Sequence, residues 1–234
     1  MLSEIWERWL HAYCRIRGYS ALEPVAEGLY LEVAKRQQSG RFFVSGFDEA
    51  VIRGLLPRIQ EPSTYVELPA PPEILAEHLP KGWRFGEAAY LMACDLRTPA
   101  GEDAGKGYWA KTDIVAGQAS VSIRAAGDGV AASGTCLVAG DEAIFDQIST
   151  EIAHRRRGLG TAVMLRLAAE ARRGGATTGL LVATLEGRRL YEALGWTVLS
   201  EVTTLVSPAP VSRSVYRIDQ GSVDGRFRAL AAAA

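Results

Sequence analysis

The residues best suited to bind a ligand form a basic, glycine-containing turn. Its members are Arg155, Arg156, Arg157, Gly158, Leu159, Gly160 and Thr161. The turn lies between a segment typical of a strand and one typical of a helix. The first turn of a helix offers free N–H groups and partial positive charge, glycines let a phosphate come close, and arginines attract it. The turn is therefore predicted to bind a diphosphate.

Spacing distinguishes this turn from two common phosphate-binding designs. A dinucleotide-binding fingerprint needs a third small residue where Val163 stands, and an acidic residue about 20 positions on, where 178–181 contain none. A Walker A loop ends in Gly-Lys-Ser/Thr, whereas 105–107 read Gly-Lys-Gly. Nucleotide binding by the same turn therefore stays only as a third hypothesis.

A second motif follows at 190–196, with the sequence Leu-Tyr-Glu-Ala-Leu-Gly-Trp. It resembles the Leu-Tyr-x-x-Leu-Gly-Phe segment of the GNAT superfamily of acyl-CoA-dependent N-acetyltransferases. The basic turn is similar to that superfamily's Gln/Arg-x-x-Gly-x-Gly/Ala pattern, which Arg155, Gly158 and Gly160 match. The resemblance covers about residues 108–206 and implies an α/β fold of the mixed α+β kind, built as in GNAT enzymes.

The resemblance also implies that acetyl-CoA is the acyl donor, and it gives each candidate residue a role. Tyr191 would protonate the departing thiolate, and the turn at 155–161 would hold the pyrophosphate. Thr184 would contact the cofactor where many relatives have an asparagine. The residues whose backbone would pair with pantetheine are Ile148, Ser149 and Thr150.

The sequence does not identify the general base. Some relatives carry a glutamate on the strand before the turn; here that strand offers Glu142 and Asp146, and Asp146 is the candidate. Thiol and phenol have reference pKa values of about 8.5 and about 10, so proton exchange between Tyr191 and a thiolate needs modest tuning. Tyr191 could instead only pack in the core, and His154 is expected to be exposed.

Regular elements surround these motifs. Gly127-Asp128-Gly129 separates two segments of strand character and predicts a hairpin at 118–138. A strand, a helix and another strand in succession imply a right-handed crossover with parallel pairing. The elements concerned are a strand at 141–150, a helix at 159–173, a buried strand at 179–184 and a helix at 186–194.

The amino-terminal part shows shorter patterns. Apolar residues at helical spacing predict a helix at 2–17, and Asp48 is a suitable N-cap for a second helix. Strands are predicted at 28–33, 41–47, 64–68 and 90–94. Tryptophans are expected in the core or a pocket wall, because no basic face accompanies them as nucleic-acid stacking would require. They are Trp83, Trp109 and Trp196.

The domain organisation has two interpretations. Residues 97–107 are polar and glycine-rich, as in a linker. If 108–115 is the first strand of the fold, the amino-terminal residues form a separate lobe, either acceptor-side or a degenerate half-domain. The parts are then a lobe at 1–96, a catalytic domain at 108–207 and a tail at 208–234. If 41–47 is that strand, the helices of the lobe belong to a single domain.

Charge and cysteine content narrow the function. Lys and Arg total 26 against 27 for Asp and Glu, which argues against nucleic-acid or membrane partners. No His/Cys cluster has metal-binding spacing, and the separated Cys14, Cys94 and Cys136 favour a reduced, cytoplasmic protein. We therefore expect transfer of an acetyl group from acetyl-CoA to a primary amine of a small molecule or peptide, with a homodimer left open. The alternative is a non-catalytic acyl-CoA-binding or regulatory module.

Overall fold

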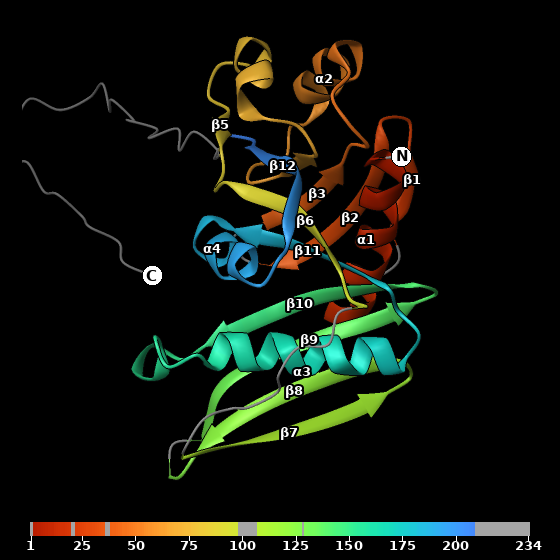
Figure 1. The fold of residues 1–234 in the computed structure, drawn as a ribbon. Coiled ribbons are helices and arrows are strands. Elements are labelled where there is room, and N and C mark those ends of the chain that lie inside the picture. The colour runs from red at the N-terminus through yellow and green to blue at the C-terminus, as the bar shows by residue number, and fades with distance from the viewer. Residues whose placement is uncertain (1, 20–21, 36–37, 98–106, 128, 209–234) are drawn as a thin grey trace, which may run out of the picture.

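The computed structural model describes residues 2–19, 22–35, 38–97, 107–127 and 129–208. The fold is a mixed α/β arrangement in which helices cover both faces of one twelve-stranded sheet (Figure 1). The first half contains α1 (Leu2–Arg17), β1 (Glu23–Val25), β2 (Gly28–Lys35), β3 (Gln38–Phe43), α2 (Glu49–Leu55), β4 (Tyr65–Leu68), β5 (Arg84–Phe85) and β6 (Ala89–Asp95). The second contains β7 (Tyr108–Val115), β8 (Gln118–Ala125), β9 (Gly129–Ala139), β10 (Glu142–Thr150), α3 (Leu159–Arg173), β11 (Thr178–Thr184), α4 (Leu185–Ala193) and β12 (Thr197–Val206).

The second half has the predicted architecture. Strands β7 to β10 form an antiparallel meander, and β10 then pairs in parallel with β11. Helix α3 makes the crossover and packs on β8, β9 and β10 through buried residues such as Val163 and Leu167. The alternation of buried and exposed residues along β8 leaves one face for this core. The predicted hairpin, crossover helix and buried strand are therefore confirmed.

Helix α1 covers the opposite face and connects the two halves. Its Trp6 and Trp9 stack with ring centroids 5.1 Å apart, and both lie in a core that also contains Leu31 of β2 and Ile144 of β10. The predicted helix at 2–17 is confirmed, as is the N-cap of α2, since the Asp48 carboxylate accepts hydrogen bonds from the first turn. Burial of both helix and strand side chains therefore ties α1 to β2 and β10.

The sheet itself runs through both halves. Strand β6 lies between β11 and β12, and β12 continues from β6 to β4. The predicted lobe at 1–96 thus contributes a central strand to the sheet of the second half, while its status as a separate folding unit stays a prediction. Most of the predicted linker (98–106) and nearly all of the predicted tail (209–234) lie outside the described residues.

Candidate active site

Strands β10 and β11 separate before they end. Their parallel ladder stops at Ile144 and Leu180, although β10 continues on β9 to Thr150 and β11 continues on β6 to Thr184. A β-bulge on β10 contributes: the register shifts between Asp146 and Ser149, and a bulge bends its strand. Beyond Ile144 and Leu180 the two neighbouring strands are therefore unpaired at their carboxyl ends, and this unpaired region is called the opening below. The predicted residues 148–150 lie in it, and β11 does not pair their backbone groups.

A glycine opposite the bulge lets the helix sit close to the bent strand. A Cβ at Gly134 of β9 would lie 2.5 Å from Cδ1 of Ile148 and 2.7 Å from Cγ1 of Val163. Both distances are shorter than any normal carbon contact, so a larger residue at this position of β9 would displace the side chains of Ile148 and Val163. The position of Ile148 therefore depends on a residue of the neighbouring strand.

The basic turn lies at the end of β10 and opens α3. Gly158 is its N-cap and has a left-handed backbone, with φ 76°, and Arg156 also has a positive φ of 62°. A Cβ at Gly158 would meet no atom within 4 Å, so the space above the turn is open. Gly160 is different, because a Cβ there would lie 3.1 Å from Cδ2 of Leu190 in α4. Leu159 is buried in the core, and Thr161 is half-buried.

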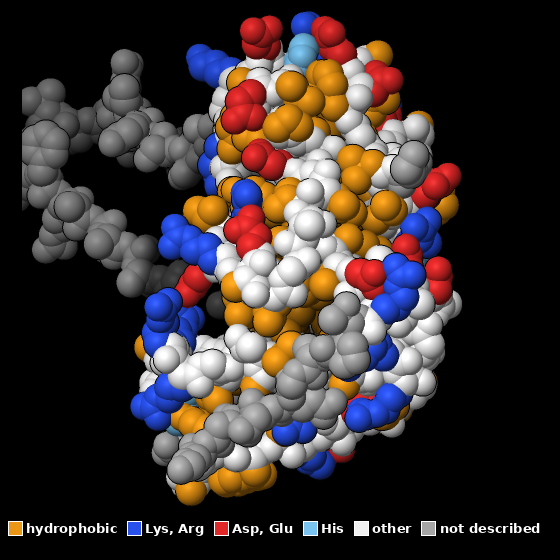
Figure 2. All heavy atoms as spheres, viewed as in Figure 1, with side chains coloured by type: hydrophobic (Ala, Val, Ile, Leu, Met, Phe, Trp, Pro, Cys, Tyr) orange, Lys and Arg blue, Asp and Glu red, His pale blue; other side chains and the backbone are white. Residues whose placement is uncertain are grey.

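The three arginines of the turn are exposed and partly anchored. The Nε of Arg155 donates to the carbonyl oxygen of Thr150 at 3.3 Å, and one of its terminal nitrogens is 3.5 Å from a carboxylate oxygen of Glu186. In Figure 2, several Lys and Arg side chains gather at the lower left, on the side of the molecule where α3 begins in Figure 1. The surroundings of the first turn of α3 therefore suit an anion.

A tyrosine distant in sequence fixes the turn from the other side. The Tyr108 hydroxyl accepts a hydrogen bond from Arg157 at 2.9 Å and lies 3.1 Å from Nδ1 of His154. Since this hydroxyl already accepts from a guanidinium, its own proton is available to Nδ1. His154 is only 8% exposed, so the expectation that it is exposed was wrong. Its ring packs edge-on against Tyr108 of β7.

If the turn binds the diphosphate of acyl-CoA, as the sequence predicts, Tyr108→Phe should weaken acyl-CoA binding by several-fold and leave kcat at saturation unchanged. The phenyl ring still packs, but Arg157 and His154 both lose the hydroxyl that holds them, and a net hydrogen bond is worth about 0.5–1.5 kcal/mol. Steady-state kinetics with varied acyl-CoA measures the effect as a rise in KM. A fall in kcat at unchanged KM would show that Tyr108 acts on the reaction rather than on the turn.

Tyr191 is buried where α4 meets the sheet. It is 8% exposed, and its ring centroid lies 6.1 Å from that of Trp196. Gly187 lies directly against the ring, because a Cβ there would be 3.1 Å from Cε2 of Tyr191. Burial, with a smaller contribution from the negative charge of Asp146, raises the pKa of Tyr191 to about 12. The phenol therefore keeps its proton throughout the neutral range.

Asp146 lies on β10 at the start of the bulge, and its carboxylate has a fixed partner. Nε and Nη2 of Arg17, on α1, donate to its two oxygens at 2.6 and 2.9 Å. The pair is partly buried, with 34% and 13% of the two side chains exposed. The bidentate contact occupies one lone pair on each carboxylate oxygen and holds the Asp146 side chain against α1. No feature of the sequence pointed to Arg17.

Thr184 ends β11 and caps α4. Its hydroxyl accepts a hydrogen bond from the backbone N–H of Gly187 at 3.1 Å. Such an N-cap satisfies one of the free N–H groups of the helix and typically stabilises it by about 1 kcal/mol. Thr184 therefore has a structural role in holding Tyr191 and α4, and its predicted contact with the cofactor stays a prediction.

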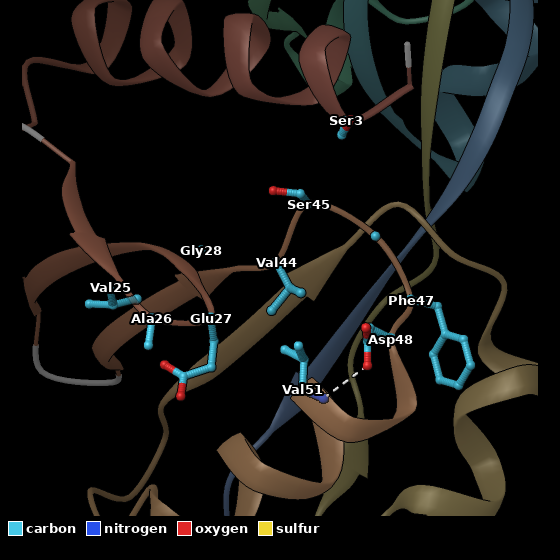
Figure 3. Close-up of a pocket in the computed structure, with 11 residues that line it drawn as sticks. Ser3, Val25, Ala26, Glu27, Gly28, Val44, Ser45, Phe47, Asp48 and Val51 are labelled. Atoms are coloured by element: carbon cyan, nitrogen blue, oxygen red, sulfur yellow. Dashed lines mark hydrogen bonds between the residues drawn. The ribbon is translucent and has the colours of Figure 1, made fainter.

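A large hollow lies elsewhere and does not include these residues. It has a volume of about 520 Å³ between the β1–β2 turn, the segment after β3 and the start of α2 (Figure 3). Its acidic side chains already have partners, since Asp48 caps α2 and Glu27 pairs with Arg58.

Within the described residues, no three His, Cys, Asp or Glu side chains gather as a metal site would require. None of the helices in the same ranges combines the length and apolar character of a membrane span.

Comparison with known proteins agrees with this arrangement. A model described as the acetyltransferase (GNAT) family matches residues 72–196. A GCN5-related N-acetyltransferase from Kribbella flavida is similar in structure, with a TM-score of 0.67 and 18% identity over 89% of this chain and 96% of that one. Another from Sphaerobacter thermophilus has a TM-score of 0.55 and 12% identity over 77% of each chain. At these identities the likeness concerns the fold. No curated protein matches the chain significantly.

Proposed function

The chain belongs to the GNAT family of acetyltransferases, and on that premise we propose that it transfers an acetyl group from acetyl-CoA to a primary amine, by direct attack in a ternary complex. The observation that carries the proposal is one juxtaposition. The opening between β10 and β11 leads to a left-handed glycine turn at one end, and a buried, protonated tyrosine comes from α4 beside it. The family implies acyl transfer, and the choice of acetyl and of an amine acceptor is the proposal.

The residues of the opening fit an acyl-CoA donor. Backbone groups of 148–150 that neither β9 nor β11 pairs can hydrogen-bond the pantetheine amides, as a further strand would, whereas the Thr150 carbonyl already accepts from Arg155. The free N–H groups at the start of α3 and the arginines at 155–157 suit the diphosphate. When bound, the thioester supplies an activated acyl carbon. A backbone N–H of the bulged strand can then donate to its carbonyl oxygen.

Two side chains remain for proton transfer. Tyr191 can donate a hydrogen bond or a proton to the leaving sulfur, because it keeps its proton at neutral pH. Asp146 stays the predicted base, although the Arg17 guanidinium already donates to both of its carboxylate oxygens. The acceptor class covers small molecules and peptides with an uncharged amine at the moment of attack. We also propose a cytoplasmic location, since the described residues include the free thiols Cys14, Cys94 and Cys136.

We expect acetyl-CoA to raise the melting temperature, because a ligand that binds only the folded state stabilises it by mass action. At 100 times Kd the gain is about 2.7 kcal/mol, or roughly 5–11 °C for a chain of this size. Differential scanning fluorimetry measures the shift, with NAD as the control for the dinucleotide hypothesis. A larger shift with NAD than with acetyl-CoA would contradict the donor assignment.

Thiol release distinguishes the enzyme from a non-catalytic acyl-CoA-binding module, since both bind acetyl-CoA. We expect release of free CoA from acetyl-CoA to depend on an added amine in a panel of mono- and polyamines, amino acids and peptide N-termini. The bidentate contact of Asp146 with Arg17 is the observation that favours the module, because it occupies the candidate base. Tight acetyl-CoA binding with no amine-dependent release would support the module.

A further inference from the structure

Strand β7 ends the sheet and carries unusually exposed apolar side chains. Among the strands that the structure describes, β7 pairs only with β8. Trp109, Ile114 and Val115 are 49%, 61% and 73% exposed. The expectation that Trp109 lies in the core or a pocket wall was wrong. An exposed edge of eight residues presents unpaired backbone groups and is a template for another strand.

The hairpin turn determines which backbone groups face this edge. All eight residues of β7 pair in regular register with β8, and the two turn residues Ala116 and Gly117 both have positive φ, 49° and 79°. That is the two-residue turn typical of hairpins, whose flanking pair exchanges both hydrogen bonds. Val115 and every second residue before it therefore point their N–H and C=O groups at β8. The residues that direct theirs outward are Tyr108, Ala110, Thr112 and Ile114.

The side chains of β7 form a sequence that is complementary to itself. Successive side chains of a strand alternate between faces, so one face carries Trp109, Lys111, Asp113 and Val115. Lys111 and Asp113 lie within 2.8 Å on that face. If a second β7 runs antiparallel with Thr112 opposite its own copy, Lys111 faces Asp113 twice. In the same register Trp109 faces Val115 twice, and the outward backbone groups of both copies meet.

The charges select this register over its neighbours. A two-fold axis through Lys111 would place Lys111 against its own copy, and an axis through Asp113 would place Asp113 against its own copy. Like charges directly opposite each other on paired strands are destabilising. If the axis falls between two residues, each residue with outward N–H and C=O groups lies opposite one whose groups point at β8. Such a register forms no hydrogen-bonded ladder. Axes through Ala110 or Ile114 also pair outward backbone groups, but they place Lys111 opposite Trp109 or Asp113 opposite Val115. Of these registers, the axis at Thr112 alone brings opposite charges, apolar side chains and outward backbone groups together.

We propose that the chain forms a two-fold homodimer in which two β7 strands pair antiparallel about Thr112 and join the two sheets. Such an interface is isologous, since the same strand serves both copies. It leaves the openings between β10 and β11 outside the interface, and it does not depend on the acetyltransferase proposal. One strand pair buries less surface than a standard interface, so the dissociation constant should be in the micromolar range.

Charge exchange tests the proposal directly. Sedimentation velocity over a wide concentration range should show a dimer for the parent and monomers for Lys111→Asp and for Asp113→Lys, each of which places like charges opposite each other. An equal mixture of these two variants should form a heterodimer, and the double exchange Lys111→Asp/Asp113→Lys should restore the homodimer. Lys111→Arg, which keeps the charge, is the matched control and should behave as the parent.

Amide hydrogen exchange gives a second readout at residue level. The N–H groups of Thr112 and Ile114 should become more protected as the concentration rises, whereas Asp113 should change little because it already pairs with β8. A parent that stays monomeric at every concentration would overturn the proposal and leave Lys111 and Asp113 as charges that discourage edge pairing. A dimer that survives both single variants would overturn it as well, because another surface would then hold the copies together.

Discussion

Replacement of Tyr191 by phenylalanine is expected to lower kcat by about 10²-fold and to leave acetyl-CoA affinity nearly unchanged. The ring still packs beside Trp196 and Gly187, and only the hydroxyl is lost. A positioned acid contributes about 10²- to 10⁴-fold, and the lower end applies here for a physical reason. Burial raises the pKa of Tyr191 to about 12, well above the reference value of about 8.5 for a thiol.

This pKa changes the mechanism expected from the sequence. Modest tuning was expected to bring the pKa values of phenol and thiol together. Desolvation instead raises the pKa of the phenol further above that of the thiol. Full proton transfer to a thiolate is then uphill, so Tyr191 should act mainly by donating a hydrogen bond to the leaving sulfur. A thioester whose thiol has a lower pKa needs that hydrogen bond less, and it should recover part of the lost rate in Tyr191→Phe.

The control for this experiment is Tyr13→Phe on α1. Tyr13 is also buried, and its hydroxyl accepts a hydrogen bond from Arg41 at 3.2 Å. Its ring, which the phenylalanine keeps, lies 4.9 Å from the Arg17 guanidinium. We expect it to lower stability by about 1 kcal/mol without a change in kcat. Parental turnover by Tyr191→Phe on its true acceptor would remove the catalytic role of this residue. The donor site would be unaffected, since it depends on the turn at 155–161.

The sequence predicts the elements of the site because their signals are local. The strand predicted at 141–150, the turn at 155–161 and the helices predicted at 159–173 and 186–194 are each specified by neighbouring residues, namely periodic apolar positions and glycines next to the ends of the elements. The N-cap by Thr184 was not predicted. The right-handed crossover then places them in order. The family resemblance supplied the candidate roles, and its boundary at residue 108 was too narrow, since the family model begins at residue 72.

The missed contacts all join residues far apart in the chain. Tyr108 meets His154 across 46 positions, and Arg17 meets Asp146 across 129. Neither partner is special by type or spacing, so only the folded sheet and α1 bring them together. Strand β6 was predicted, but its place between β11 and β12 follows from which edges remain open, and periodicity carries no such information. Exposed Trp109 was misjudged because tryptophan is usually well buried.

Substitution of Gly158 by alanine is expected to weaken acetyl-CoA binding by about 10- to 100-fold. A Cβ at this position enters the open space above the first turn of α3, where the diphosphate would lie. It also opposes the left-handed backbone, with φ 76°, that aims the following N–H groups outward. One or two hydrogen bonds to a charged group would be lost, and each is worth about 1.5–3 kcal/mol. Isothermal titration calorimetry measures the change.

Gly140→Ala provides the matched control, because it separates backbone strain from ligand contact. Gly140 lies in the β9–β10 turn, has φ 66°, and a Cβ there would also meet no atom within 4 Å. Both variants should therefore lose similar stability, about 1–2 kcal/mol for an L-residue in the left-handed region. Only Gly158→Ala should lose acetyl-CoA affinity and the ligand-induced rise in melting temperature. If Gly158→Ala binds acetyl-CoA as tightly as Gly140→Ala does, the turn at 155–161 is not the diphosphate site.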